Sequence, residues 1–215
     1  MSRRLLITRP EHDDTTHYLS SWSKKIISFA ESKGVRVFDL NRRRANKKEV
    51  DGLLSKQKPG LVIFNGHGSD NLVSGHGNEP LIIAGDNEEL LSGKITYAIS
   101  CKSAKKLGPR SIDVGAKAYI GYDDDFIFFY DPNKITHPLK DKTAKLFLEP
   151  SNELITSLVK GNTVEESYNR SKKYFKNNFK KLLSSETTEE ETSMARYLWW
   201  DMIHQVCLGS KKSIF

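Results

Sequence analysis

Hydrophobic residues in the first two thirds of the chain form short runs that alternate with amphipathic or polar segments. The stretch from Asp13 to Lys33 has apolar residues at steps of four and three, which is the spacing of one helix face, and Gly34 follows it as a helix-ending residue. The continuous run Leu61–Phe64 is typical of a strand buried on both faces. Strands are predicted near residues 4–8, 35–40, 61–64, 81–84, 95–100 and 118–122, and a further helix over 46–56. Strands separated by helices predict an α/β fold with a mostly parallel sheet flanked by helices.

The last third of the chain has a different pattern, because from about Pro138 onward it predicts helices only. One of them opens with the capping box Thr163-x-x-Glu166. The expected helices cover residues 139–148, 151–160, 163–183 and about 186–208. No linker precedes them, so we expect an all-helical C-terminal part, 138–215, packed on the sheet within a single domain of residues 1–215.

Composition fits a soluble globular protein, with 37% hydrophobic and 28% charged residues. The apolar runs are too short to cross a bilayer, and the N-terminal run ends at Thr8, which is too early for a secretory signal. We therefore expect a cytoplasmic protein with no membrane partner. The two cysteines, Cys101 and Cys207, lie far apart in the sequence, and in a reducing compartment both would be free thiols.

The formal net charge of +7 allows an acidic partner without identifying one. Basic runs of this kind are usually solvated helix faces, and no helix-turn-helix, zinc-finger or aromatic RNA-binding pattern accompanies them. Nucleic-acid binding therefore stays an alternative function, and we do not expect nucleic acid as a direct partner. The runs lie at residues 42–44, 47–48, 102–106 and 172–181.

Two reactive residues directly follow predicted strands. His67 comes after Leu61–Phe64 between two glycines, and Cys101 comes after the strand predicted over 95–100. Open α/β sheets carry their active sites outside the carboxyl ends of the strands, so the pair predicts a Cys–His catalytic dyad. The backbone N–H groups of Gly68 and Cys101 would form an oxyanion hole. A helix N-terminus after Cys101 and a nearby imidazole would lower the pKa of the thiol.

Each half of this pair has an alternative. A lone cysteine beside a buried strand is most often a small core residue. His76, in a second Gly-His-Gly motif, competes with His67 for the catalytic role, although it lies in a long polar loop. A metal site formed by His67 and His76 lacks further ligands in the sequence, so we expect no metal and no cofactor.

Five segments together form a recognisable pattern: Phe64–Gly68, Pro80–Gly85, Glu89–Leu91, Ile99–Ala104 and Gly115–Gly121. Over residues 61–183 the chain resembles the CHAT proteases of the caspase–gingipain–separase superfamily. This resemblance implies a caspase-like fold and a cysteine protease with His67 and Cys101 as its dyad. The sequence departs from the family where Lys102-Ser103-Ala104 follows the cysteine and where Tyr122 stands in place of a common tryptophan.

The resemblance also bears on substrates and partners. Asp123, Asp124 and Asp125 follow the strand after the cysteine strand, and they could hold a basic P1 residue of a polypeptide substrate; alternatively, they form an ordinary turn. Relatives often act in larger assemblies or after an activating signal, so an activating protein partner is expected, and the aromatic closing helix, with Trp199, is consistent with one. A catalytically silent caspase-like binding module is the alternative.

Overall fold

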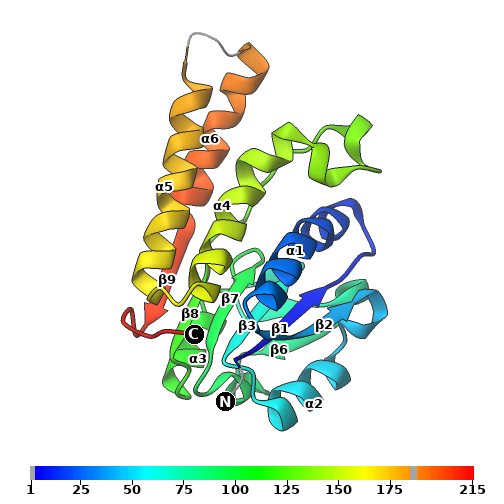
Figure 1. Cartoon of the computed structure of the whole chain (residues 1–215), viewed down its shortest axis with the longest axis vertical. Helices are drawn as coiled ribbons and strands as arrows, with labels where there is room; N and C mark the ends of the chain where they lie inside the picture. The colour runs from blue at the N-terminus through cyan, green and yellow to red at the C-terminus, as the bar shows by residue number, and fades with distance from the viewer. Residues whose placement is uncertain (1–2, 185–187) are drawn as a thin grey trace.

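A computed structural model of the chain describes residues 3–184 and 188–215. Within them lie nine strands and six α-helices (Figure 1). The strands are β1 (Arg4–Arg9), β2 (Arg36–Asn41), β3 (Leu61–Asn65), β4 (Gly68–Ser69), β5 (Leu72–Ser74), β6 (Pro80–Ile83), β7 (Ile95–Ile99), β8 (Ala118–Tyr122) and β9 (Gln205–Gly209). The helices are α1 (Asp14–Ser32), α2 (Lys47–Gln57), α3 (Leu107–Asp113), α4 (Lys142–Val159), α5 (Val164–Leu182) and α6 (Glu189–His204). Short 3₁₀ turns span Arg42–Arg44, His76–Asn78, Glu88–Leu91, Pro132–Lys134 and Pro138–Lys140.

The main sheet has six strands in the order β2-β1-β3-β7-β8-β9. All neighbouring pairs are parallel except β8 and β9. This confirms the predicted mostly parallel sheet with flanking helices. No helix in the described part of the chain is long and apolar enough to cross a membrane.

Alternate residues of the buried strands point to opposite faces of the sheet, and each face has its own core. In β1, Leu5 and Ile7 belong to the core that includes residues of α1, α4, α5 and α6. Leu6 belongs to the core that α2, α3 and the strands β5 and β6 help to form. Helices therefore cover both faces, as a parallel sheet requires. Figure 1 shows α5 and α6 side by side, with their far ends extending beyond the sheet.

Two predicted elements in the middle of the chain differ from the structure. Residues 81–84 do not enter the main sheet, because β6 pairs with β5 in a small antiparallel sheet that also holds β4. The helices expected over 139–148 and 151–160 form one helix, α4, with Pro150 inside it. Proline removes a helical hydrogen bond, but buried residues on both sides of it, such as Phe147 and Leu154, keep the helix packed on the core.

The C-terminal part is helical only as far as His204, so the expectation of an all-helical part is wrong at its end. The closing helix was expected from about residue 186, and residues 185–187 lie outside the described residues; α6 begins at Glu189. Residues 205–209 form β9, which pairs antiparallel with β8. An open edge of the sheet leaves unpaired backbone groups, and β9 satisfies those of β8.

A buried glutamine links β9 to the centre of the molecule. Gln205 Nε2 donates to the hydroxyl oxygens of Tyr97, Tyr122 and Ser171 at 3.2, 3.3 and 3.1 Å. These partners lie on β7, β8 and α5, and Ser151 of α4 lies 3.3 Å from the Tyr122 hydroxyl. One polar network therefore connects the sheet with the C-terminal helices.

We expect Gln205→Ala to lower the free energy of unfolding by about 2 kcal/mol, because it leaves a cavity and removes donors from buried hydroxyl groups. Chemical denaturation of the variant and the wild type measures this difference. Ser210→Ala, at an exposed position just beyond β9, is the control and should change stability little. Equal stability of Gln205→Ala and wild type would contradict a structural role for the network.

Candidate active site

His67 and Cys101 occupy equivalent positions at the carboxyl edge of two paired strands. Strands β3 and β7 run parallel, and their last paired residues are Asn65 and Ile99. His67 comes two residues after Asn65, and Cys101 comes two residues after Ile99. The two predicted site residues therefore leave the sheet side by side.

The backbones that follow the two strands are in close contact at Gly68. A Cβ atom at this position would lie 2.8 Å from the Cys101 carbonyl oxygen and 3.0 Å from the Ser100 Cβ. Real Cβ atoms do not come this close to backbone oxygen atoms, so only glycine fits. The glycine after His67 thus lets the histidine loop lie directly against the cysteine turn.

Hydrogen bonds hold the backbone of His67 from two sides. Its carbonyl accepts bonds from the Ser74 N–H at 2.9 Å and the Ser74 hydroxyl at 3.0 Å. Just before it, the Asn65 side chain donates to the Thr8 carbonyl at 2.7 Å, which ties the ends of β1 and β3 together. Gly66 allows the turn between them, since its φ of +146° is rare for other residues.

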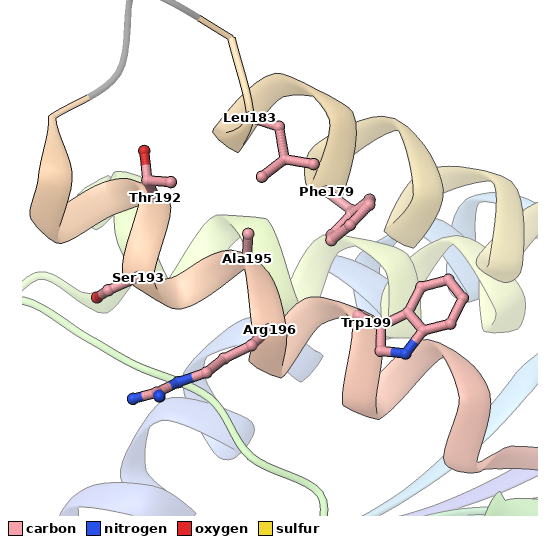
Figure 2. Close-up of a pocket in the computed structure, with 7 residues that line it drawn as sticks. All are labelled: Phe179, Leu183, Thr192, Ser193, Ala195, Arg196 and Trp199. Atoms are coloured by element: carbon pink, nitrogen blue, oxygen red, sulfur yellow. The ribbon is translucent and has the colours of Figure 1, made fainter.

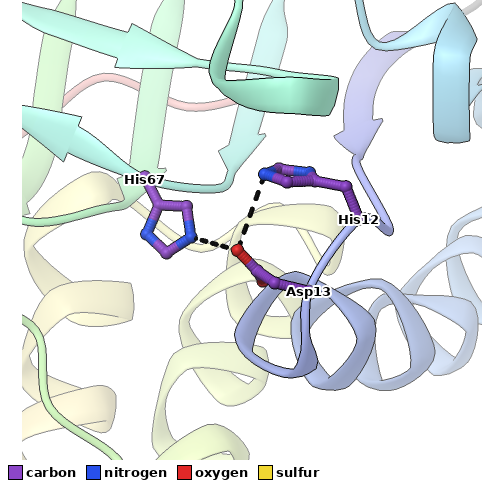
Figure 3. Close-up of side chains that lie close together, drawn as sticks. All are labelled: His12, Asp13 and His67. Carbon is purple, nitrogen blue, oxygen red and sulfur yellow. Dashed lines mark hydrogen bonds and ion pairs between the residues drawn. The ribbon is translucent and has the colours of Figure 1, made fainter.

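The imidazole of His67 contacts Asp13, which the sequence indicated only as the start of a helix. The Asp13 side chain is the N-cap of α1, and its Oδ1 accepts from the Thr16 N–H and hydroxyl, both at 2.8 Å. Its Oδ2 lies 2.7 Å from Nε2 of His67 (Figure 3). Burial favours protonation of Asp13, but the bonds from Thr16 and His67 outweigh it and lower the pKa of this carboxyl.

Sequence reasoning could have found Asp13 from its place after β1. Strand β1 is the other neighbour of β3 in the sheet, and a polar residue just after its carboxyl end lies at the same edge as His67. His12, which precedes Asp13, also faces the carboxylate, with its Nε2 3.5 Å from Oδ2.

His76, the alternative catalytic histidine, lies beside His12. The two rings pack edge to face with centroids 5.3 Å apart, and Nδ1 of His76 accepts from the Glu11 N–H at 3.5 Å. The long polar loop expected around it is instead the small sheet of β4, β5 and β6 with a 3₁₀ turn that begins at His76.

Cys101 is half-buried, and its Sγ donates to the Phe126 carbonyl at 3.8 Å. Burial raises the pKa of the thiol, and the nearby Asp125 carboxylate adds to this effect. The helix expected directly after Cys101 begins only at Leu107, after a turn in which Lys102 has a φ of +57°. The predicted helix N-terminus directly after Cys101 is thus wrong, and the pKa of the thiol is raised and not lowered.

The three aspartates after β8 form pairs with positively charged or titratable side chains. Asp123 Oδ1 lies 2.7 Å from Nδ1 of His204. Lys102 Nζ lies 3.0 Å from Asp125 Oδ2 and 3.8 Å from Asp124 Oδ1. The acidic cluster therefore lies beside the cysteine turn, and it already holds a lysine side chain.

The groove with the largest volume among those described lies elsewhere, between the far ends of α5 and α6 (Figure 2). It has a volume of ≈ 600 Å³ and includes Leu183 and Trp199, which are 55% and 47% exposed. Trp200 points to a different place, because its Nε1 donates to the Asp125 carbonyl at 2.9 Å. One of the two neighbouring tryptophans thus supports the acidic cluster, and the other lines the groove.

The same arrangement of elements occurs in a solved cysteine protease. The crystal structure of the Arg-specific cysteine proteinase gingipain R aligns with a TM-score of 0.62 and 11% sequence identity over 99% of this chain. The chain has the caspase-like fold. It spans about half of the gingipain chain, with 47% covered. At this identity the likeness establishes the caspase-like fold alone.

Other comparisons add little to this. An imine reductase from Bacillus cereus aligns over 57% of this chain and 41% of that protein with 17% identity, but its TM-score of 0.28 is too low to support an inference. No protein-family model and no curated protein sequence matches the chain. The resemblance to CHAT proteases in particular is thus supported only as far as the caspase-like fold.

We expect Asp125→Asn to accelerate alkylation of Cys101 at pH 8, because loss of the carboxylate lowers the pKa of the thiol and increases the thiolate fraction. Iodoacetamide labelling followed by peptide mass spectrometry measures the rate. In the wild type, the rate should rise with pH through and above the ordinary thiol range, since the pKa of Cys101 is raised.

Two controls accompany this measurement. Cys207, whose pKa burial raises to about 11, should react slowly in both proteins. Asp123→Asn removes an aspartate that pairs with His204 and should leave the rate at Cys101 unchanged. An unchanged or slower rate in Asp125→Asn would show that this carboxylate does not control the thiol.

Proposed function

We propose that the chain is a cysteine endopeptidase that cleaves polypeptides with Cys101 and His67 as its catalytic pair. The observation that carries this proposal is the equal offset of both residues from the last paired residues of β3 and β7. The caspase-like fold supports it, and so does the carboxylate of Asp13 at Nε2 of His67. A half-buried thiol, an imidazole and an orienting carboxylate are the components of nucleophilic catalysis on acyl groups.

The reaction begins from the neutral thiol. As Sγ of Cys101 attacks the scissile carbonyl carbon, its proton passes to Nδ1 of His67, because Nε2 is engaged with Asp13. The His67 imidazolium then gives this proton to the leaving amine, and the C–N bond breaks to leave a thioester. Water hydrolyses the thioester with His67 as the base, which releases the acid and restores the thiol.

The Gly68 and Cys101 N–H groups are proposed to stabilise the oxyanion. Gly68 pairs with Val73, but the neighbouring Ser74 N–H donates to the His67 carbonyl, which makes Gly68–Val73 a non-hydrogen-bonded pair. The Gly68 N–H is therefore directed away from β5. Together with the N–H of Cys101, it is suited to bind developing negative charge near the attacking sulfur.

A basic P1 residue is the substrate feature that the acidic cluster favours. The Lys102 ammonium forms ion pairs with Asp124 and Asp125, which indicates that these carboxylates can bind a cationic side chain beside Cys101. A P1 arginine would compete with Lys102 for the same oxygens, and a bidentate guanidinium binds carboxylates better than a lysine ammonium. The Arg specificity in the name of gingipain R agrees with this choice.

A second candidate function is a catalytically silent protein-binding module. Two observations favour it: the raised pKa of Cys101 in the resting chain and the exposed groove with Trp199. An active peptidase that needs a protein activator would share both features. The two functions differ in what happens to a peptide substrate.

We expect the wild type to cleave peptides with Arg or Lys at P1 faster than peptides with Ala or Asp, and Cys101→Ala to lose all cleavage. Fluorogenic peptides that differ only at P1 measure both, and cell extract is added in a parallel series to supply an activator. Cys207→Ala is the matched control and should keep full activity. Cleavage that persists in Cys101→Ala would refute the proposal, and no cleavage in either series would favour the silent module.

Asp13→Asn should lower kcat by roughly 10²-fold or more with little change in KM. An amide N–H facing Nε2 of His67 would place the ring proton on Nδ1, where it cannot accept the proton of the thiol. Asparagine is as good an N-cap as aspartate, so α1 should remain intact, which circular dichroism checks. Asp14→Asn, one residue further on, is the control; an equal kcat in Asp13→Asn and wild type would remove Asp13 from the mechanism.

A further inference from the structure

Three potential metal ligands converge beside β3 from two distant parts of the chain. His12, Asp13 and His67 each offer one ligand atom, and these atoms all lie within 4.8 Å of one another. Figure 3 shows both imidazoles turned toward the Asp13 carboxylate. Nε2 of His67 and Nε2 of His12 lie 2.7 and 3.5 Å from Oδ2. The sequence suggests His67 and His76 as metal ligands but no third one. It does not point to His12 and Asp13, because they lie more than fifty residues before His67.

We propose that His12, Asp13 and His67 bind a zinc ion. Two imidazole nitrogens and one carboxylate oxygen form a ligand set of the kind that zinc takes in sites that keep a fourth position for water. With bonds of about 2.0–2.2 Å, tetrahedral ligands lie roughly 3.3 Å apart. The two separations from Asp13 Oδ2 are 2.7 and 3.5 Å, and the two histidine nitrogens lie within 4.8 Å of each other. Only small side-chain movements are therefore needed.

The protein holds the carboxylate in a position suited to a single metal bond. Oδ1 of Asp13 is occupied by its two bonds from Thr16, so Oδ2 alone faces the histidines. Thr16 is buried, and the cap fixes the carboxylate at the first turn of α1. Asp13 thus works as a monodentate ligand whose direction is set before a metal arrives.

Both histidines direct Nε2 toward the Asp13 carboxylate, so zinc would bind at Nε2 of each ring. Nε2 of His12 contacts the Asn78 Oδ1 at 3.2 Å, while its buried Nδ1 has no hydrogen-bond partner among the described residues. Zinc at Nε2 would therefore displace the contact with Asn78 and move the ring proton to Nδ1. The side chains of His67 and Asp13 are 40% and 39% exposed, so an ion can reach them from solvent.

Zinc at this site would switch off the proposed peptidase, and this consequence rests on the proposed function. A zinc ion on Nε2 of His67 would replace the contact with Asp13 and place the ring proton on Nδ1. The imidazole could not then accept the proton of Cys101. The same carboxylate would orient the base in the absence of zinc and would help to sequester it in the presence of zinc.

The binding test uses the full chain with Cys101→Ala, so that neither a reactive thiol nor peptidase activity enters the result. Zinc titration against a chromophoric chelator should give one saturable site per chain. A second substitution, His12→Ala, in the Cys101→Ala protein should weaken zinc binding by at least about 10-fold, because even residues that only support metal ligands contribute this much to affinity. His137→Ala, an exposed histidine outside the cluster, should leave affinity unchanged.

Cobalt gives a second readout, which reports the geometry of the bound metal. Cobalt(II) in the Cys101→Ala protein should show the visible absorption of a tetrahedral nitrogen–oxygen site, and this spectrum should disappear in both His12→Ala and His67→Ala. Circular dichroism checks that the variants fold. Absence of a saturable zinc site would overturn the proposal, and so would a zinc affinity of the His12→Ala and His67→Ala variants equal to that of the Cys101→Ala parent.

Inhibition is measured separately in the wild-type chain. Zinc should abolish peptide cleavage, and a chelator should restore it. The activity of each protein is expressed relative to its own rate without zinc. The zinc concentration that gives half inhibition should be at least about 10-fold higher for His12→Ala than for the wild type. An inactive wild type with an intact zinc site would refute only the proposed function, and an active wild type without a zinc site would refute only the metal proposal.

Discussion

The parallel register between β3 and β7 is the constraint on which the rest of the candidate site depends. Because side chains of a strand alternate between faces, a shift of one residue would move His67 or Cys101 to the other side of the sheet. Five residue pairs, from Leu61 with Ile95 to Asn65 with Ile99, hold this register, and all ten residues are buried. The dominant hydrophobic burial of the sheet therefore also positions the two loops that carry His67 and Cys101.

Asp13 joins the formation of a helix to the chemistry of the site. One oxygen of its carboxylate caps α1 and the other contacts His67, so the same side chain satisfies a helix end and orients an imidazole. Helix α1 packs through Tyr18, Leu19 and Trp22 on the core that the sheet shares with α4. Any movement of α1 along the sheet would therefore also move the carboxylate that faces His67.

The C-terminal elements stabilise the other side of the site. Strand β9 extends the sheet beyond β8, and the Trp200 indole holds the Asp125 carbonyl. Asp201, whose pKa burial raises well above its usual range, accepts the Ile127 N–H at 2.9 Å. Helix α6 thus fixes the segment after β8 that carries the acidic cluster. The exposed groove lies at the far ends of α5 and α6, and none of the residues that line it belongs to the segment after β8.

The sequence by itself predicted five strands of the main sheet, helix α1 and the two residues that are proposed as the catalytic pair. Strong local patterns made this possible: continuous apolar runs for β3 and β7, helical spacing for α1, and a reactive residue directly after each strand. Only the tertiary structure decided the partners of these residues. Asp13 meets His67 because β1 lies beside β3, and Lys102 occupies the acidic cluster because β8 lies beside β7. Strand order is set by packing of the whole sheet, and no local pattern encodes it. For the same reason, the sequence of β9 looks like the end of a helix, and only its pairing with the open edge of β8 makes it a strand.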